Sequence, residues 1–146
     1  MEYHVKKFTE LTVPEFYRIV TERIAVFVVE QNCPYQEVDE VDAQALHTYF
    51  ADDAGNVLAY TRIFEEGDAV HFGRVLVAES QRKNGLGRKI VENTIKVIEE
   101  TYPGKPIVIG AQEYLQEFYR SFGFKAVSDV YLEDDIPHID MKKEAN

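Results

Sequence analysis

One segment decides how this chain folds: residues 75–88 read Val-Leu-Val-Ala-Glu-Ser-Gln-Arg-Lys-Asn-Gly-Leu-Gly-Arg. An apolar stretch typical of a strand ends at Ala78, and a helical pattern begins at Gly85. Glycines at the mouth of a helix let the backbone approach a ligand closely. The free amides and the positive end of the helix dipole then favour an anion such as a pyrophosphate. The basic residues 82, 83 and 88 concentrate positive charge at this turn.

Two better-known phosphate motifs do not fit this segment. A dinucleotide fingerprint needs a third glycine three residues after Gly87, where Ile90 stands. A P-loop needs Gly-Lys followed by Ser or Thr, which the chain lacks. Taken alone, the two glycines fit a plain strand-to-helix turn as well as a phosphate site.

Composition indicates one globular domain over residues 1–146. Hydrophobic residues make up 45% and charged residues 29% of the chain, which are ordinary globular values. The formal net charge is −10, and phosphate-backbone binding needs clustered Lys and Arg. We therefore expect no nucleic-acid partner and an attraction for cationic ligands.

The cysteine content and the hydropathy pattern point to a cytoplasmic protein. A single cysteine, Cys33, excludes an internal disulfide and a Cys-rich zinc site. The first seven residues show no apolar core of a signal peptide. No apolar run approaches the ~18 residues of a membrane span, so no membrane partner is expected.

The periodicity predicts a mixed α/β sheet in the order β-α-β-β-β-α-β-α-β-β. Thr12 and Glu15 form a capping-box pattern with Pro14 in the first turn, so a helix should begin there and run to about Val29. Residues 30–45 read as a long acidic loop. Strands are predicted at 3–8, 46–51, 57–64, 69–78, 107–111, 125–132 and 136–142, and further helices at 85–102 and 113–122.

A second motif makes the pattern specific. Residues 118–124 read Phe-Tyr-Arg-Ser-Phe-Gly-Phe. Together with Arg82-x-x-Gly85-x-Gly87 and the element order, this resembles the GNAT (GCN5-related N-acetyltransferase) superfamily along nearly the whole chain. Residues 26–35, Val-Phe-Val-Val-Glu-Gln-Asn-Cys-Pro-Tyr, resemble its ElaA-like branch, whose acceptor is not generally assigned.

The resemblance implies that acetyl-coenzyme A is the cosubstrate. Backbone amides of the turn would hold its pyrophosphate, the third long strand would pair with its pantetheine arm, and Gln112 would bond the same arm. One departure is Lys83, because many members have glycine there. The cofactor-binding residues implied are Val75, Leu76, Val77, Arg82, Lys83, Asn84, Gly85, Leu86, Gly87, Arg88 and Gln112.

The resemblance also implies the reaction, an attack of a primary amine on the thioester with no covalent enzyme intermediate. Tyr119 would be the general acid for the departing thiolate, and an amide near Leu76 or Val77 would stabilise the oxyanion. The base stays unassigned among Glu30, His71 and Glu113. A non-catalytic acyl-coenzyme A binding domain on the same fold is the alternative.

Acceptor and oligomeric state stay open: a small-molecule amine, a peptide N-terminus or a protein lysine would serve, and a homodimer is possible. A thiol nucleophile built from Cys33 and His47 is a weaker alternative, since a lone cysteine is more often inert packing.

The remaining charged and titratable residues have structural interpretations. Arg62 and Arg74 lie in predicted strands, where an unpaired charge is costly. We expect them to pair with Asp39, Glu40 or Asp42, or else to line the acceptor site. The four histidines lack metal-ligand spacing, so no metal is expected: His4, His47, His71 and His138.

Overall fold

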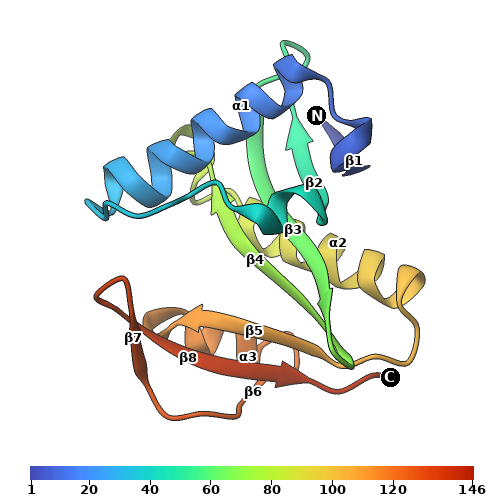
Figure 1. Cartoon of the computed structure of the whole chain (residues 1–146), viewed down its shortest axis with the longest axis vertical. Coiled ribbons are helices and arrows are strands. Elements are labelled where there is room, and N and C mark those ends of the chain that lie inside the picture. Colours follow the sequence, from blue (N-terminus) through green and yellow to red (C-terminus); the bar gives the residue numbers. More distant parts are fainter.

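The computed structural model describes all residues from 1 to 146 and contains an eight-stranded mixed sheet with helices on both faces (Figure 1). The strands are β1 (Glu2–Lys7), β2 (Leu46–Ala51), β3 (Val57–Glu66), β4 (Ala69–Val77), β5 (Ile107–Gln112), β6 (Lys125–Ala126), β7 (Tyr131–Glu133) and β8 (Ile136–Lys143). The helices are α1 (Val13–Ile24), α2 (Leu86–Thr101) and α3 (Gln116–Arg120). Five short helical segments are η1 (Phe8–Glu10), η2 (Ala25–Glu30), η3 (Glu40–Ala43), η4 (Glu79–Gln81) and η5 (Glu113–Leu115). The spatial order is β1-β2-β3-β4-β5-β8-β6, with β7 paired to β8, and this confirms the predicted α/β fold.

The first helix begins where the capping pattern predicts. Thr12 Oγ1 accepts a hydrogen bond from the Glu15 amide at 3.2 Å, and Glu15 Oε1 accepts one from the Thr12 amide at 2.8 Å. The predicted extent to about Val29 is right, but the geometry changes after Ile24, because η2 is wound as a π-helix. Such segments occur frequently at functional sites.

Two predicted elements near the C-terminus are shorter than expected. The helix predicted at 113–122 is a 3-10 turn followed by α3, which ends at Arg120. The strand predicted at 125–132 is divided into β6 and β7. The side chain of Ser128 accepts a hydrogen bond from the Asp140 amide at 2.9 Å, so a side chain replaces the backbone ladder between the two short strands.

Two apolar clusters lie on opposite faces of the sheet. The larger holds 17 buried residues and joins the sheet to α2 and α3, as shown by Ile90, Ile109 and Tyr119. The smaller holds eight buried residues and joins the sheet to α1 and η2, through Ile19 and Phe27. Each face of the sheet is therefore covered by its own helices, and the sheet opens to a cavity where its strands separate.

The strands separate between β4 and β5, the parallel pair at the centre of the sheet. Only two residue pairs join them, Val70 with Ile107 and His71 with Val108. Beyond these pairs the strands diverge toward their C-terminal ends (Figure 1). The diverging halves leave backbone groups without a ladder partner, and such groups need hydrogen bonds from elsewhere.

A β-bulge lies in the diverging half of β4. Tyr60 faces Leu76 and Arg62 faces Gly73 across the β3–β4 pair, so β4 uses one residue more than β3. Arg74 within this bulge has φ of 51°, a left-handed conformation that is costly for a residue with a Cβ. An extra residue reverses the in-and-out alternation of the strand beyond it.

Arg74 is held in this conformation by the acidic loop. Its Nε donates to Glu37 Oε2 at 3.0 Å, and its Nη2 donates to the Glu37 carbonyl at 3.1 Å and to Asp39 at 3.4 Å. Its guanidinium also lies over the Tyr35 ring, 5.4 Å from the centroid. The expected pairing with Asp39 is confirmed, but Glu37 is a partner that the sequence did not indicate.

Arg62 pairs with the same loop from β3. Its Nη1 donates to Asp39 Oδ1 at 2.7 Å and to Asp42 Oδ1 at 3.1 Å. The expected pairing is therefore confirmed for these two aspartates, whereas Glu40 forms no ion pair. The Nε of Arg62 is buried without a partner.

A third arginine, from α1, completes this ion cluster. Arg23 is fully buried, and its Nε and Nη2 donate to Glu37 Oε2 at 3.0 and 2.6 Å. Its Nη1 donates to Asp42 Oδ1 at 2.6 Å. Burial alone would raise the pKa of Asp42, but the bonds and charges of the arginines outweigh it and lower that pKa. The cluster therefore stabilises the fold above the ordinary aspartate pKa, and this contribution is lost as the pH falls through the lowered value.

Substituting Arg23 with Met should destabilise the protein strongly. Two buried carboxylates would lose their main partner, and breaking a buried ion pair in this way costs roughly 3–5 kcal/mol. Urea unfolding at neutral pH measures the change. The matched control is Arg18→Met on the exposed side of the same helix, where the one bond lost is to Asn56. Equal losses for both variants would contradict a structural role for the buried cluster.

Replacing Lys83 with Gly should stabilise the protein. Lys83 has φ of 70°, a left-handed conformation that glycine adopts without a steric penalty. Relief of the left-handed penalty, ~1–2 kcal/mol, exceeds the entropy cost of glycine, ~0.5–1 kcal/mol, so a net gain of about 0.5–1 kcal/mol is expected. Gly85→Ala, at φ 77°, should change the unfolding free energy in the opposite direction. A loss for Lys83→Gly in urea unfolding would refute the assignment of strain.

Candidate active site

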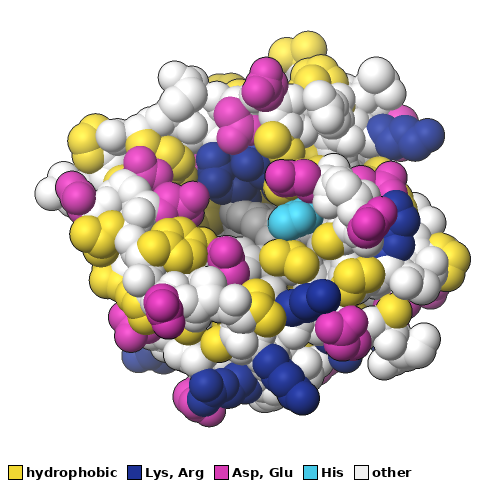
Figure 2. Space-filling view, turned by 60° about the horizontal axis from the view of Figure 1, so that its bottom comes forward, with side chains coloured by type: hydrophobic (Ala, Val, Ile, Leu, Met, Phe, Trp, Pro, Cys, Tyr) yellow, Lys and Arg dark blue, Asp and Glu magenta, His cyan; other side chains and the backbone are white.

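A cavity of about 410 Å³ opens where β4 and β5 diverge. It is lined from one face of the sheet by Phe72, Val75 and Tyr119, and from the other by residues of the acidic loop and of the β7–β8 hairpin. Figure 2 shows the molecule hollowed near the centre of this face, with basic side chains and histidine beside the hollow. Because the lining comes from both faces, the cavity passes through the sheet.

The predicted phosphate turn lies at the N-terminus of α2. Gly85 is the N-cap in a left-handed conformation, with φ of 77°, and no side chain caps the helix. The first amides, from Leu86, Gly87 and Arg88, therefore have no intrahelical acceptor and no side-chain acceptor. A Cβ at Gly85 would meet nothing within 4 Å, whereas one at Gly87 would touch the Val77 side chain at 3.5 Å. The turn thus offers open space and free donors to an anionic group.

The basic side chains of this turn are used in different ways. Arg82 forms two bonds of 2.7 Å with Glu30, and its Nε donates to the Val77 carbonyl at 3.1 Å. Arg88 lies over the Phe122 ring at 4.6 Å and bonds Ser121 at 2.9 Å. Lys83 and Asn84 are exposed, and Lys83 forms no ion pair, so Lys83 is the one basic side chain of the turn that is free to meet a phosphate.

Along β4, successive backbone amides point alternately toward the cleft and toward β3. The Ala78 amide donates to the Leu58 carbonyl at 2.9 Å. Because amides alternate in direction along an antiparallel pair, Leu76 bonds to β3, and the Val77 amide points to the diverging side. Val77 is therefore better placed than Leu76 as an oxyanion donor, and its carbonyl is already used by Arg82. Val75 lines the cavity.

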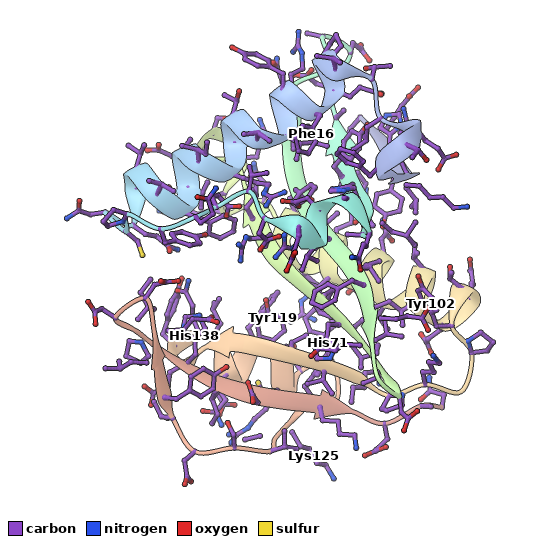
Figure 3. All side chains as sticks on the ribbon, viewed as in Figure 1. Phe16, His71, Tyr102, Tyr119, Lys125 and His138 are labelled. Carbon is purple, nitrogen blue, oxygen red and sulfur yellow. The ribbon has the colours of Figure 1, made fainter.

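Tyr119 lies in the wall of the cavity on the α3 side (Figure 3). Its ring is 4% exposed and packs edge-on against Phe118 and Phe124, at centroid distances of 5.1 and 6.1 Å. Its hydroxyl has no protein hydrogen-bond partner. Burial, with a smaller effect of Tyr114, raises the pKa of Tyr119 above its ordinary value. The phenol therefore keeps its proton at neutral pH, and the raised pKa also makes it a weaker proton donor than an exposed tyrosine.

Of the other residues that the sequence indicates, some line the cavity and one does not. Gln112 lines the cavity, and its Nε2 lies 3.5 Å from Gln31 Oε1. His71 lines it too and stacks on Phe64 at 5.2 Å. Glu113 is exposed and does not line the cavity.

Glu30 is poorly suited to be the base. The hydrogen bonds from Arg82 lower its pKa, so it holds its negative charge in an exposed ion pair. A carboxylate with a lowered pKa is a weaker proton acceptor.

The thiol alternative does not fit the geometry. Cys33 is buried, and its Sγ lies 3.6 Å from the Asp134 carbonyl. Burial, then the charges of Asp134 and Asp135, raise the pKa of the thiol, so the thiolate needed for attack is disfavoured. His47 bonds the Tyr60 hydroxyl at 2.6 Å and forms no bond with Cys33.

Sequence reasoning missed several cavity residues. They come from two acidic segments far apart in the chain, the loop before β2 and the β7–β8 hairpin. Tyr35 ends the stretch that resembles the ElaA-like branch and Asp39 was expected as an arginine partner, but no motif indicates that these residues share a cavity. They are Tyr35, Asp39, Tyr131, Glu133 and His138. No group of three His, Cys, Asp or Glu side chains lies close enough to hold a metal ion, and none of the helices is long and apolar enough to span a membrane.

Comparison with known proteins agrees with this geometry. Residues 15–145 match the model of the acetyltransferase (GNAT) domain. Protein ElaA of Escherichia coli is 40% identical over 148 residues, covering 99% of this chain and 97% of that protein. A UPF0039 protein of Schizosaccharomyces pombe is 43% identical over 146 residues, with coverage of 99% and 97%.

Solved structures give the same result. The crystal structure of E. coli ElaA has a TM-score of 0.94, covering 99% of this chain and 100% of that one. An acyl-CoA N-acyltransferase from Pseudomonas aeruginosa, 39% identical, has a TM-score of 0.93, with coverage of 98% and 99%. The predicted resemblance is confirmed, and the chain belongs to the GNAT acetyltransferase family, in its ElaA-like branch.

Proposed function

We propose that this protein transfers an acetyl group from acetyl-coenzyme A to a primary amine by direct attack within a ternary complex. The observation that carries the proposal is the cavity through the sheet, with Tyr119 in its α3-side wall and the acidic loop on the other side. The P. aeruginosa relative is an acyl-CoA N-acyltransferase, and this likeness supports the same reaction class. The acceptor is a small-molecule or peptide amine, and we place the reaction in the cytoplasm.

The cosubstrate would enter from the α2 and α3 side. Its pyrophosphate would accept hydrogen bonds from the free amides of Leu86, Gly87 and Arg88, favoured by the helix dipole. Its pantetheine arm would run beside the diverging half of β4, where the Val77 amide has no strand partner. Gln112 would bond this arm from β5, across the cleft. The thioester would then lie in the opening between β4 and β5.

The chemistry uses few groups of the protein. A neutral amine attacks the thioester carbonyl carbon, and the carbonyl electrons move onto oxygen. The Val77 amide stabilises this oxyanion, as preorganised donors do in other acyl transfers. The carbon–sulfur bond then breaks, and Tyr119 donates its phenolic proton to the departing thiolate. The phenolate regains a proton from the positively charged nitrogen of the product, which leaves a neutral amide.

Acetyl-coenzyme A should raise the unfolding temperature of the wild type, and Gly85→Glu should abolish this rise. A ligand at 100 times its Kd adds ~2.7 kcal/mol to the folded state, which corresponds to a rise of roughly 5–10 °C at this chain length. A glutamate at residue 85 repels the pyrophosphate.

The matched control is Gly67→Glu, at the other end of β4. Gly67 also has a positive φ, 62°, with open space around its Cβ position. It should lose comparable stability and keep the ligand shift. No shift in the wild type at saturating ligand would overturn the cosubstrate assignment.

Tyr119→Phe should lower kcat for thiol release by at least ~10²-fold, the usual contribution of general acid–base catalysis, while the Kd of acetyl-coenzyme A stays unchanged. Stopped-flow trapping of free thiol and isothermal titration measure the two quantities. Tyr114→Phe, 75% exposed on the preceding turn, is the control. A wild type that binds the cosubstrate but releases no thiol with any amine would be a non-catalytic acyl-coenzyme A binding domain.

A further inference from the structure

We propose that His138 is the general base of the reaction, with Glu133 stabilising its charged form. This inference rests on the proposed function, which requires that an ammonium group lose a proton before it attacks. Three features of the structure support it: the face of the sheet on which His138 lies, the tautomer of its ring, and the charges around the ring.

His138 occupies the acceptor side of the cavity. It is paired with Gln112 in the β5–β8 ladder, and paired residues point to the same face of a sheet. The neighbours Ile109 and Ala111 belong to the core under α2 and α3, so Gln112 and His138 point to the opposite face. Figure 3 shows His138 toward the open end of the cleft, beyond Tyr119. His138 and Tyr119 thus line one cavity from opposite faces of the sheet.

The ring of His138 is fixed in the tautomer that a base needs. Its Nδ1 lies 2.7 Å from the Ile136 carbonyl oxygen. A carbonyl can only accept, so Nδ1 carries the hydrogen, and in the neutral ring Nε2 keeps its lone pair. The stacking of the ring on Tyr131, with centroids 6.1 Å apart and planes at 25°, holds this orientation. The ring is 8% exposed, so Nε2 is reached through the cavity.

Glu133 is placed to stabilise the proton once it has moved. Its Oε2 lies 3.4 Å from His138 Nε2, so protonation converts this contact into an ion pair. Glu133 itself is mostly exposed and can turn aside to admit the ammonium group.

The other groups near His138 are mainly acidic or neutral. On β7 the Tyr131 hydroxyl donates to Asp140 at 2.6 Å, and β5 contributes the uncharged Gln112. The turn adds Asp134, and η5 adds the exposed Glu113 and Tyr114. Across the cavity lie His71 and three members of the ion cluster: Asp39, Arg62 and Arg74. The arginines are paired with carboxylates, so no free cation faces His138.

The other candidates are placed less well. His71 is paired with Val108, where β4 and β5 are still joined, at the closed end of the cleft. No hydrogen bond fixes its tautomer. Asp39 is bound by Arg62 through two bonds of 2.7 and 3.1 Å, and the net effect of its arginine partners lowers its pKa.

The proton transfer balances with no added reagent. The lone pair of His138 Nε2 takes a proton from the ammonium nitrogen, and the electrons of the broken N–H bond become the lone pair that attacks the thioester. The imidazolium, paired with Glu133, later releases its proton to water. The second nitrogen proton leaves after the carbon–sulfur bond breaks, as described for Tyr119.

The test compares two probes of one skeleton. Benzylamine is largely protonated at neutral pH, whereas O-benzylhydroxylamine is largely unprotonated and needs no base before attack. The acceptor is the amine, protonated at neutral pH, that gives the fastest thiol release in a wild-type screen that includes benzylamine. With this acceptor, His138→Asn should lower kcat/KM by at least ~10²-fold at neutral pH. The loss should shrink as the pH rises toward the pKa of the acceptor amine, and should be small for O-benzylhydroxylamine. Asparagine keeps an N–H donor near the position of Nδ1.

Controls separate this inference from the proposed function. His71→Asn should not show the pH-dependent pattern, and both variants should keep the acetyl-coenzyme A shift. Glu133→Gln should lower kcat/KM for the protonated acceptor, because the imidazolium loses its ion-pair partner, and should leave the rate with O-benzylhydroxylamine unchanged. In ¹⁵N NMR of the free wild type, the neutral His138 ring should carry its hydrogen on Nδ1.

Three results would overturn the assignment of His138 alone: an unchanged rate for His138→Asn, a loss equal at every pH and for both probes, or a hydrogen on Nε2. A wild type that releases no thiol with any amine overturns the proposed function and the base together.

Discussion

The constraint on which the structure depends is the short pairing of β4 with β5, which stops after two residue pairs. A parallel pair in the middle of a sheet normally continues, because unpaired backbone groups are costly in a buried place. Here the divergence exposes the edge of β4 to a cavity rather than to the core. A cosubstrate with amide groups along its arm can supply the missing bonds. The opening is therefore suited to such an arm, because backbone groups of β4 lack ladder partners there.

The bulge at Arg74 and the buried ion cluster maintain this opening. Arg74 adopts a left-handed conformation and is bound by Glu37, which is also bound by Arg23 from α1. Three arginines and three carboxylates balance in charge, and such clusters often add little net stability, since desolvation opposes attraction. The effect of the cluster on the geometry of the site is larger than its effect on stability. They join α1, the acidic loop and the bulge into one unit. The position of the loop that lines the cavity is therefore fixed relative to β4.

Local signals in the sequence predicted most of the fold, and long-range contacts account for the rest. The capping box at Thr12 and the glycine turn at Gly85 are decided by neighbouring residues, and the structure confirms both as helix starts. The π-helical winding after Ile24 and the break at Ser128 depend on tertiary contacts that no periodicity reports. Within the candidate site, the glycine turn and Tyr119 belong to contiguous motifs. The position of His138 depends instead on its pairing with Gln112 and on its place across the sheet from Tyr119, which no local motif indicates.

The charge distribution gives the two faces of the sheet different partners. The chain carries a net charge of −10, yet free amides and Lys83 gather at the start of α2, which suits an anionic cosubstrate. On the opposite face, Asp39, Glu133 and Asp134 line the cavity, and this favours an approaching ammonium group. The same acidic surroundings stabilise the ammonium form, which cannot attack, so attraction alone would slow the reaction. A base on that face resolves the conflict, because it removes the proton after the charge has served for binding.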